Sequence, residues 1–311
     1  GFLKILGATA GTAAIASCGI NDDKTTASAD DMATTPANVP DSGMTMRTNP
    51  KTGDQVSLLG YGCMRLPTTA GNSAREDDSG IDQEQVNRLV DYAIEHGVNL
   101  FDTSPAYCKG QSEKAMGIAL SRHPRDKYFL STKLSNFAPA TWSYAESVKM
   151  YRNSMRELQT DYLDYYLLHA IGRENYPVYT EMDCFAWLKE KKEAGLVRHM
   201  GFSYHDDAEF LDQVLTEHPE MEFVQLQINY LDWENESIQS RACYEVARKH
   251  GMPIIVMEPV KGGTLVNLPE AALKEMTTGS PASYAIRYAA GLSDVCMVLS
   301  GMSNMEQMQD N

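Results

Sequence analysis

Short apolar runs separated by amphipathic stretches recur along the chain from about residue 46 onward. In residues 83–96, the apolar positions that share one helix face are Val86, Leu89, Val90, Ala93 and Ile94. Gly97 ends this predicted helix, and the apolar run 98–102 follows it as a buried strand. The same order of amphipathic stretch, Gly and apolar run returns at 191–203 and at 247–259. The pattern therefore predicts helices and strands in alternation.

Eight strands are predicted, at residues 56–62, 98–102, 127–133, 161–169, 196–203, 222–229, 252–259 and 294–301. Strands that alternate with helices form parallel sheets. Eight units over about 265 residues favour an α/β fold, the closed (β/α)8 TIM barrel. The alternative is an open doubly wound sheet, whose G-x-G-x-x-G signature is absent because the segment GYGCMR at 60–65 has only two of the glycines.

The first 45 residues do not follow this pattern. Residues 1–18 are an apolar run too short to span a membrane and typical of the remnant of a signal peptide. The opening Phe-Leu-Lys resembles the end of a twin-arginine (Tat) signal, and residues 15–18 resemble a lipoprotein lipobox with a lipidated Cys18. Residues 19–45 are predicted to be a disordered linker. We expect an exported protein, periplasmic or membrane-anchored through Cys18. The alternative for residues 1–18 is a poorly ordered terminus or a short core helix, and the alternative location is the cytoplasm.

Composition narrows the classes of function. Hydrophobic residues make up 43% of the 311 residues, enough for a large core. The formal net charge of -15 argues against a nucleic-acid partner, because phosphate contacts need a basic face. None of the six cysteines forms a C-x-x-C pair, so the sequence predicts no metal site. Cys63 and Cys108 are expected near the barrel mouth, where local packing is favoured over a redox-sensitive pair.

Polar residues interrupt the predicted strands near their carboxyl ends, where (β/α)8 barrels place their active sites. These residues are Asp102, Lys133, His169, Ser203, Gln225 and Glu258. Tyr107 lies on the loop that follows Asp102. Because the carboxyl ends of the strands meet at one mouth, we expect these side chains to face one another.

Four of these residues form a coherent set for proton transfer. A tyrosine has an ordinary pKa of about 10, too high for easy proton transfer near neutral pH. We expect Lys133 to lower the pKa of Tyr107, and Asp102 to hold Lys133 charged and in place. A neutral His169 can donate a hydrogen bond to a carbonyl and orient it. Each residue alone has a structural explanation, but four at the ends of consecutive strands favour catalysis.

The motifs around these residues resemble those of the aldo/keto reductase family. The segment FDTSPAYCKGQSEKAMGIAL at 101–120 is similar to a family signature, and LSTKL and DYYLLHA resemble its lysine and histidine segments. The resemblance runs from about residue 46 to residue 311 and places the family's tetrad on Asp102, Tyr107, Lys133 and His169. It implies an oxidoreductase that transfers a hydride between NAD(P)H and an aldehyde or ketone, or the corresponding alcohol, with Tyr107 as general acid/base.

The resemblance also implies a site for NADP or NAD. Ser203 and Gln225 correspond to contacts of the carboxamide, and Met257 stands where an aromatic residue commonly stacks on the nicotinamide. Further candidate cofactor-binding residues are Pro259, Lys261, Gly262, Ser303, Gln307 and Asn311. Tyr204 replaces the usual Asn after the serine. Residues 301–311 lack the Lys or Arg that often holds the 2′-phosphate, so NADP and NAD both stay open, with Lys261 a candidate substitute.

Further details resemble the branch of the family that carries a ferredoxin-like extension with 4Fe-4S (iron–sulfur) clusters. Such an extension would lie beyond Asn311, and the barrel of residues 46–311 is expected to be truncated at its C-terminal end. The alternative function is a nucleotide-binding redox or docking module of an envelope electron-transfer complex, with an electron-transfer partner and little turnover of its own. The intact tetrad favours the small-molecule oxidoreductase.

Overall fold

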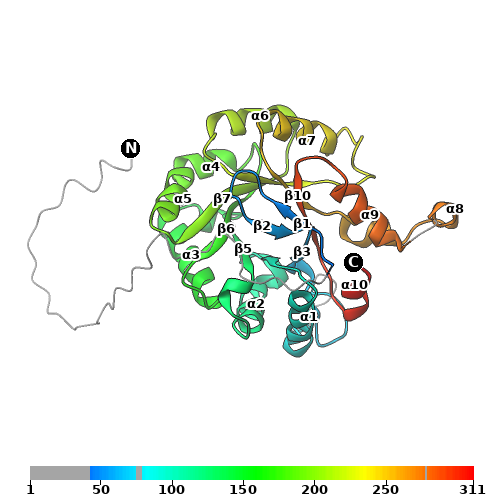
Figure 1. Cartoon of the computed structure of the whole chain (residues 1–311). Helices are drawn as coiled ribbons and strands as arrows, with labels where there is room; N and C mark the ends of the chain where they lie inside the picture. The colour runs from blue at the N-terminus through cyan, green and yellow to red at the C-terminus, as the bar shows by residue number, and fades with distance from the viewer. Residues whose placement is uncertain (1–42, 75–78, 277–278) are drawn as a thin grey trace, which may run out of the picture. The chain divides into compact units, whose positions relative to one another are not determined.

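The computed structural model describes residues 43–74, 79–276 and 279–311. In this part of the chain, parallel strands close into an eight-stranded barrel, which confirms the predicted (β/α)8 fold (Figure 1). Its strands are β3 (Leu59–Gly62), β4 (Leu100–Asp102), β5 (Phe129–Leu134), β6 (Leu163–Ile171), β7 (Val197–Tyr204), β8 (Phe223–Gln227), β9 (Ile254–Met257) and β10 (Val295–Ser300). The predicted signal remnant 1–18, Cys18 and nearly all of the linker 19–45 lie outside the described residues and stay predictions.

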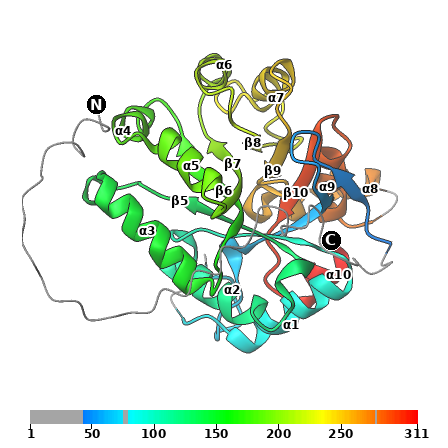
Figure 2. The same ribbon diagram turned by 60° about the vertical axis from the view of Figure 1, so that its left-hand side comes forward.

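Helices lie around the strands, and Figures 1 and 2 both show α6 beside α7. The helices are α1 (Gln83–Glu95), α2 (Ser112–Leu120), α3 (Tyr144–Glu157), α4 (Tyr176–Glu181), α5 (Cys184–Glu193), α6 (Ala208–Glu217), α7 (Ser240–Lys249), α8 (Glu270–Glu275), α9 (Pro281–Ala290) and α10 (Met305–Asp310). Asp82 caps α1 by accepting a hydrogen bond from the Gln85 amide, and Gly97 follows the helix at φ 88°. No helix among the described residues is long and apolar enough to cross a membrane.

A two-stranded hairpin precedes the barrel and corrects one predicted element. The predicted strand 56–62 divides at Leu58: β2 (Gln55–Ser57) pairs antiparallel with β1 (Met46–Thr48), and only β3 enters the barrel. Asn99, just before β4, accepts a hydrogen bond from the Ser57 amide at 2.8 Å and donates one to the Gln55 carbonyl at 2.9 Å. The hairpin therefore contacts the amino-terminal end of the barrel, beside β10 (Figure 2).

Large side chains fill the interior of the barrel. Its buried apolar cluster includes Leu100, Phe129, Tyr165, Leu167, Phe223, Ile255, Met297 and Leu299. Two strands present glycine to this space. A Cβ at Gly60 would lie 2.7 Å from the side chains of Leu299 and Met297, and one at Gly201 would lie 2.5 Å from the Phe223 carbonyl oxygen. The interior is thus a packed core, and ligand chemistry is confined to the strand ends.

A network of buried charges lies at the amino-terminal end of the barrel. Arg198 is 3.1 Å from Asp54 on the hairpin and 2.8 Å from Asp164 on β6. His199 lies between two carboxylates, with Nε2 3.0 Å from Asp54 and Nδ1 3.3 Å from Glu222. Burial lowers the pKa of His199, but these two carboxylates outweigh it, so the pKa lies above its ordinary value.

This network predicts a pH-dependent contribution to stability. Because the folded-state pKa of His199 exceeds the unfolded value of about 6.5, its contribution is fully present below about pH 6.5 and is lost as pH rises through the folded-state pKa. We expect His199→Gln to remove this pH-dependent part of the free energy of unfolding, measured by urea denaturation at about pH 6 and about pH 9. His96→Gln, at an exposed helix end, is the control. Equal pH dependence in His199→Gln and the wild type contradicts the prediction.

Candidate active site

A buried ion pair lies at the carboxyl-terminal mouth of the barrel. Asp102 ends β4 and Lys133 lies near the end of β5, and the Lys133 ammonium pairs directly with one Asp102 oxygen. The other oxygen accepts a hydrogen bond from Ser131 at 2.8 Å. Lys133 also donates to the Thr103 carbonyl at 2.8 Å. Burial lowers the pKa of Lys133, but Asp102 and Tyr107 outweigh it and leave the pKa above its ordinary value, so Lys133 is charged as predicted.

Tyr107 lies directly against this ion pair. It begins the 3-10 helix Tyr107–Gly110 after β4, and the Lys133 ammonium is 4.5 Å from the centre of its ring. Burial raises the pKa of the Tyr107 hydroxyl and outweighs the lowering effect of the Lys133 ammonium. The predicted lowering of this pKa is therefore wrong in its net direction. The lysine acts in the expected sense, but burial is the larger contribution.

His169, near the end of β6, completes the predicted set. Its ring centre lies 5.8 Å from that of Tyr107, and the two rings are nearly perpendicular. Burial, the Lys133 charge and His205 hold the pKa of His169 well below its ordinary range, so the imidazole is neutral at neutral pH, as expected. Its Nδ1 contacts two hydroxyls, Ser135 at 2.6 Å and Ser104 at 3.3 Å.

The two predicted carboxamide contacts are buried beside the tetrad. Gln225, on β8, donates a long hydrogen bond of 3.4 Å to Asp102. Ser203, on β7, accepts a hydrogen bond from the Ala170 amide at 2.7 Å. Tyr204, which replaces the usual Asn after the serine, is buried and donates to the Asp207 carbonyl at 2.6 Å. Its side chain points away from the barrel axis because neighbouring strand residues alternate in direction.

Other predicted cofactor residues meet at the ends of β3, β9 and β10. Gly262 has φ 61°, and a Cβ there would lie 2.6 Å from a terminal nitrogen of the Arg65 guanidinium. Ser303 donates to the Arg65 carbonyl at 2.6 Å. Lys261, the proposed substitute for a phosphate-binding base, already pairs with the buried Asp232. Half-buried Arg65 has no hydrogen bond or ion pair for its guanidinium among the described residues.

The remaining predicted residues are held by local contacts. Met257 ends β9 half-buried, and Pro259 is buried in the turn that follows. Gln307 accepts a hydrogen bond from the Ser303 amide at 2.7 Å, and Asn311 donates to Ser300 at 2.8 Å. The five cysteines in the described part of the chain are free and buried, consistent with the packing role favoured for Cys63 and Cys108.

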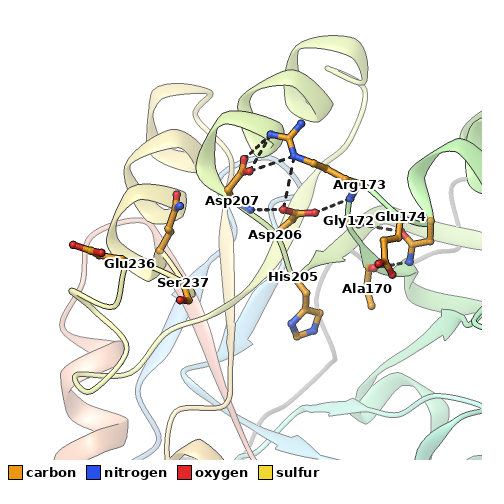
Figure 3. Close-up of a pocket in the computed structure, with 11 residues that line it drawn as sticks. Ala170, Gly172, Arg173, Glu174, His205, Asp206, Asp207, Glu236 and Ser237 are labelled. Atoms are coloured by element: carbon orange, nitrogen blue, oxygen red, sulfur yellow. Dashed lines mark hydrogen bonds and ion pairs between the residues drawn. The ribbon is translucent and has the colours of Figure 1, made fainter.

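A polar pocket of about 560 Å³ lies among the loops that follow β6, β7 and β8; Ala170 and His205 line it, and no member of the tetrad does. Figure 3 shows Arg173 reaching toward Asp206 and Asp207, with His205 pointing away from this cluster. Arg173 donates to both Asp207 oxygens, at 2.9 and 3.0 Å, and its amide donates to Asp206 at 2.7 Å. These two carboxylates therefore have partners within the protein.

The sequence reasoning missed four residues at this mouth: Arg65, Ser104, Ser135 and Phe137. Phe137 is 49% exposed, and its ring centre lies 4.7 Å from that of His169. The sequence holds a signal for each of the two serines. Ser104 lies inside the Asp102–Tyr107 segment, and Ser135 follows Lys133 by two positions, which keeps it on the same face of an extended chain. No sequence signal marked Phe137.

The closed barrel and the buried ion pair at its carboxyl-terminal mouth form the arrangement in which (β/α)8 enzymes place their active sites. The sequence profile of the Aldo/keto reductase family matches residues 58–311, and the chain belongs to this family. This confirms the predicted enzyme class, an oxidoreductase.

Individual relatives agree with this assignment. An aldo-keto reductase of Mycolicibacterium vanbaalenii is 29% identical over 70% of this chain and 74% of its own length. L-galactose dehydrogenase of Arabidopsis thaliana is 27% identical over 84% of each protein. The holo structure of an aldo-keto reductase from Bacillus halodurans has a TM-score of 0.66 and 26% identity, over 86% of this chain and 89% of the other. An aldo/keto reductase from Klebsiella pneumoniae in complex with NADP and acetate has a TM-score of 0.65 and 21% identity, over 83% and 86% of the two chains.

The buried ion pair predicts strong coupling between its partners. We expect Asp102→Asn to destabilise the protein by about 3–5 kcal/mol, because the fully buried Lys133 ammonium loses its counter-charge. Adding Lys133→Met should recover part of this loss, measured as a double-mutant cycle in urea. Glu146→Gln, in the exposed pair with Lys149, is the control and should change stability little. Additive effects of the two buried substitutions contradict the prediction.

Proposed function

We propose that this protein transfers a hydride between NAD(P)H and a small aldehyde or ketone, or the corresponding alcohol. One observation carries the proposal: Tyr107 and His169 lie side by side at the mouth, with the charged Lys133 against the Tyr107 ring. Two neutral hydrogen-bond donors beside a buried cation can bind and polarise one carbonyl oxygen. Family membership supports the same reaction class.

Each member of the tetrad has a distinct role in this proposal. Tyr107 donates its proton to the carbonyl oxygen as that oxygen gains negative charge, and Lys133 stabilises the resulting phenolate. Asp102 keeps Lys133 charged and fixed between β4 and β5. His169, neutral because of its buried surroundings, donates a hydrogen bond that orients the carbonyl.

The residues beside the tetrad fit a dinucleotide. Ser203 and Gln225 would hold the carboxamide, and Met257 would lie against the nicotinamide. Gly262 adopts a left-handed φ of 61° and lies against the end of the Arg65 side chain, and the Arg65 guanidinium is available for an anion. We assign Arg65, rather than the paired Lys261, to the phosphates, with Pro259, Ser303, Gln307 and Asn311 nearby. When bound, the nicotinamide supplies or accepts the hydride.

The polar pocket among the loops that follow β6, β7 and β8 would take the remainder of the substrate. Its wall of hydroxyl, amide and charged groups suits a substrate rich in hydroxyls, whereas Phe137, whose ring centre lies 4.7 Å from that of His169, offers an apolar surface. A first substrate panel therefore pairs aldoses, including L-galactose after the Arabidopsis relative, with aromatic aldehydes and ketones.

The proposal predicts that Tyr107→Phe lowers kcat/KM for carbonyl reduction by about 10²–10⁴-fold, because the proton donor is lost. The dissociation constant of NADPH, measured by protein fluorescence, should be unchanged. Tyr92→Phe, on the outer helix α1, is the matched control. Full turnover by Tyr107→Phe would remove Tyr107 as the acid. NADPH binding by the wild type without turnover on the whole panel would favour the docking-module alternative and an electron-transfer partner.

A second prediction concerns the phosphates. We expect Arg65→Met to weaken NADPH binding about tenfold or more, since one charge-assisted hydrogen bond contributes about 1.5–3 kcal/mol. Comparing NADPH with NADH distinguishes the two phosphate positions. A loss of affinity confined to NADPH places Arg65 at the 2′-phosphate, and an equal loss of affinity for both nucleotides places it at the pyrophosphate. Arg241→Met, at an exposed pair with Glu234, is the control. Unchanged binding of both nucleotides contradicts the assignment.

A further inference from the structure

Two buried serines contact the same ring nitrogen of His169. The Ser135 hydroxyl oxygen lies 2.6 Å from Nδ1 and the Ser104 hydroxyl oxygen lies 3.3 Å from it. The two hydroxyl oxygens are 3.0 Å apart. The Ala106 amide donates to the Ser104 hydroxyl oxygen at 3.0 Å. These are all the hydrogen bonds of the two hydroxyls among the described residues.

The Ala106 amide can only donate, so it occupies one lone pair of the Ser104 hydroxyl oxygen and leaves the Ser104 proton to be donated elsewhere. The Ser104 hydroxyl oxygen accepts a hydrogen bond from the Ala106 amide, and the Ser104 hydroxyl can donate a hydrogen bond to the Ser135 oxygen. Ser135 then donates its proton to Nδ1 of His169. In this arrangement both hydroxyl protons have acceptors, and Nδ1 accepts a hydrogen bond. A neutral imidazole that accepts at Nδ1 carries its proton on Nε2.

The opposite tautomer leaves a proton without an acceptor. If Nδ1 carried the proton, it would donate to one of the serines and could not accept from either. The two hydroxyls could then satisfy only one of their protons, through the bond between them. The other proton would remain unpaired where Ser104 is fully buried and Ser135 is 7% exposed. Buried polar groups without partners are disfavoured.

We propose that Ser104 and Ser135 are positioning residues that hold neutral His169 with its proton on Nε2. This inference rests on the proposed function, in which His169 must donate to the carbonyl oxygen. Nε2 has no hydrogen-bond partner among the described residues, so it is the ring nitrogen left for a substrate. A lone pair on Nε2 would face the carbonyl oxygen and repel it. The serines therefore select the tautomer that can bind substrate.

Ser104 also helps to position Tyr107, the proposed proton donor. Its carbonyl accepts a hydrogen bond from the Tyr107 amide at 3.1 Å, while its hydroxyl accepts from the Ala106 amide. One residue thus holds the backbone turn that leads to Tyr107 and orders the proton on His169. Through it, the two groups that would bind the carbonyl oxygen are linked.

The tautomer can be observed without any substrate. In protein labelled with 15N histidine at about pH 7.5, the His169 signals, assigned by their loss in His169→Gln, should show a protonated Nε2 and an unprotonated Nδ1. We expect the double variant Ser104→Ala/Ser135→Ala to show a mixture of tautomers. A proton on Nδ1 in the wild type overturns the proposal. So does an unchanged tautomer in the folded double variant.

Kinetics provide the second readout. We expect Ser135→Ala to lower kcat about 10–100-fold with little change in the dissociation constant of NADPH, and Ser135→Thr, which keeps the hydroxyl, to retain most of the activity. Ser57→Ala is the matched control: Ser57 is also fully buried, donates to Leu59 at 2.7 Å and accepts from Asn99 at 3.0 Å at the opposite end of the barrel. Equal kcat in Ser135→Ala and the wild type overturns the proposal. If the wild type turns over no carbonyl, the proposed function fails while the NMR result still decides the tautomer.

Discussion

The buried ion pair between Asp102 and Lys133 is the constraint on which the mouth of the barrel depends. A fully buried ammonium needs a counter-charge and hydrogen-bond acceptors, and both come from β4 and the residue after it. Asp102 in turn accepts from Ser131 and Gln225, on β5 and β8. These contacts tie three strand ends together, and Tyr107 lies against the side of the lysine that they leave open.

Burial of this mouth affects the protonation of Tyr107, His169 and Lys133. Burial favours the neutral form of every group, so the Tyr107 hydroxyl keeps its proton and the His169 imidazole is neutral, with a proton on one ring nitrogen only. Lys133 stays charged because Asp102 compensates for burial. The result is two neutral donors beside one cation, an arrangement that in the proposed reaction would bind a neutral carbonyl and stabilise the negative charge that develops on its oxygen.

The two ends of the barrel have separate tasks. At the amino-terminal end, Asp54, Arg198 and His199 join the hairpin to β6 and β7 through buried charge pairs. At the other end, the loops hold the polar pocket and the groups that would meet a dinucleotide. Between them lies a packed apolar core in which Gly60 and Gly201 make room for large side chains. The packed core therefore separates the buried charges of the two ends.

The sequence by itself determined the barrel, because alternating periodicities specify strands and helices and their order specifies a parallel sheet. It also placed Asp102, Lys133 and His169 at one mouth, since each follows or ends an apolar strand. Tertiary structure alone decided the net pKa shift of Tyr107, the division of 56–62 into hairpin and barrel strand, and the partners of Lys261 and Arg65. The reason is physical: burial and contacts between distant residues arise from packing, which local patterns do not encode.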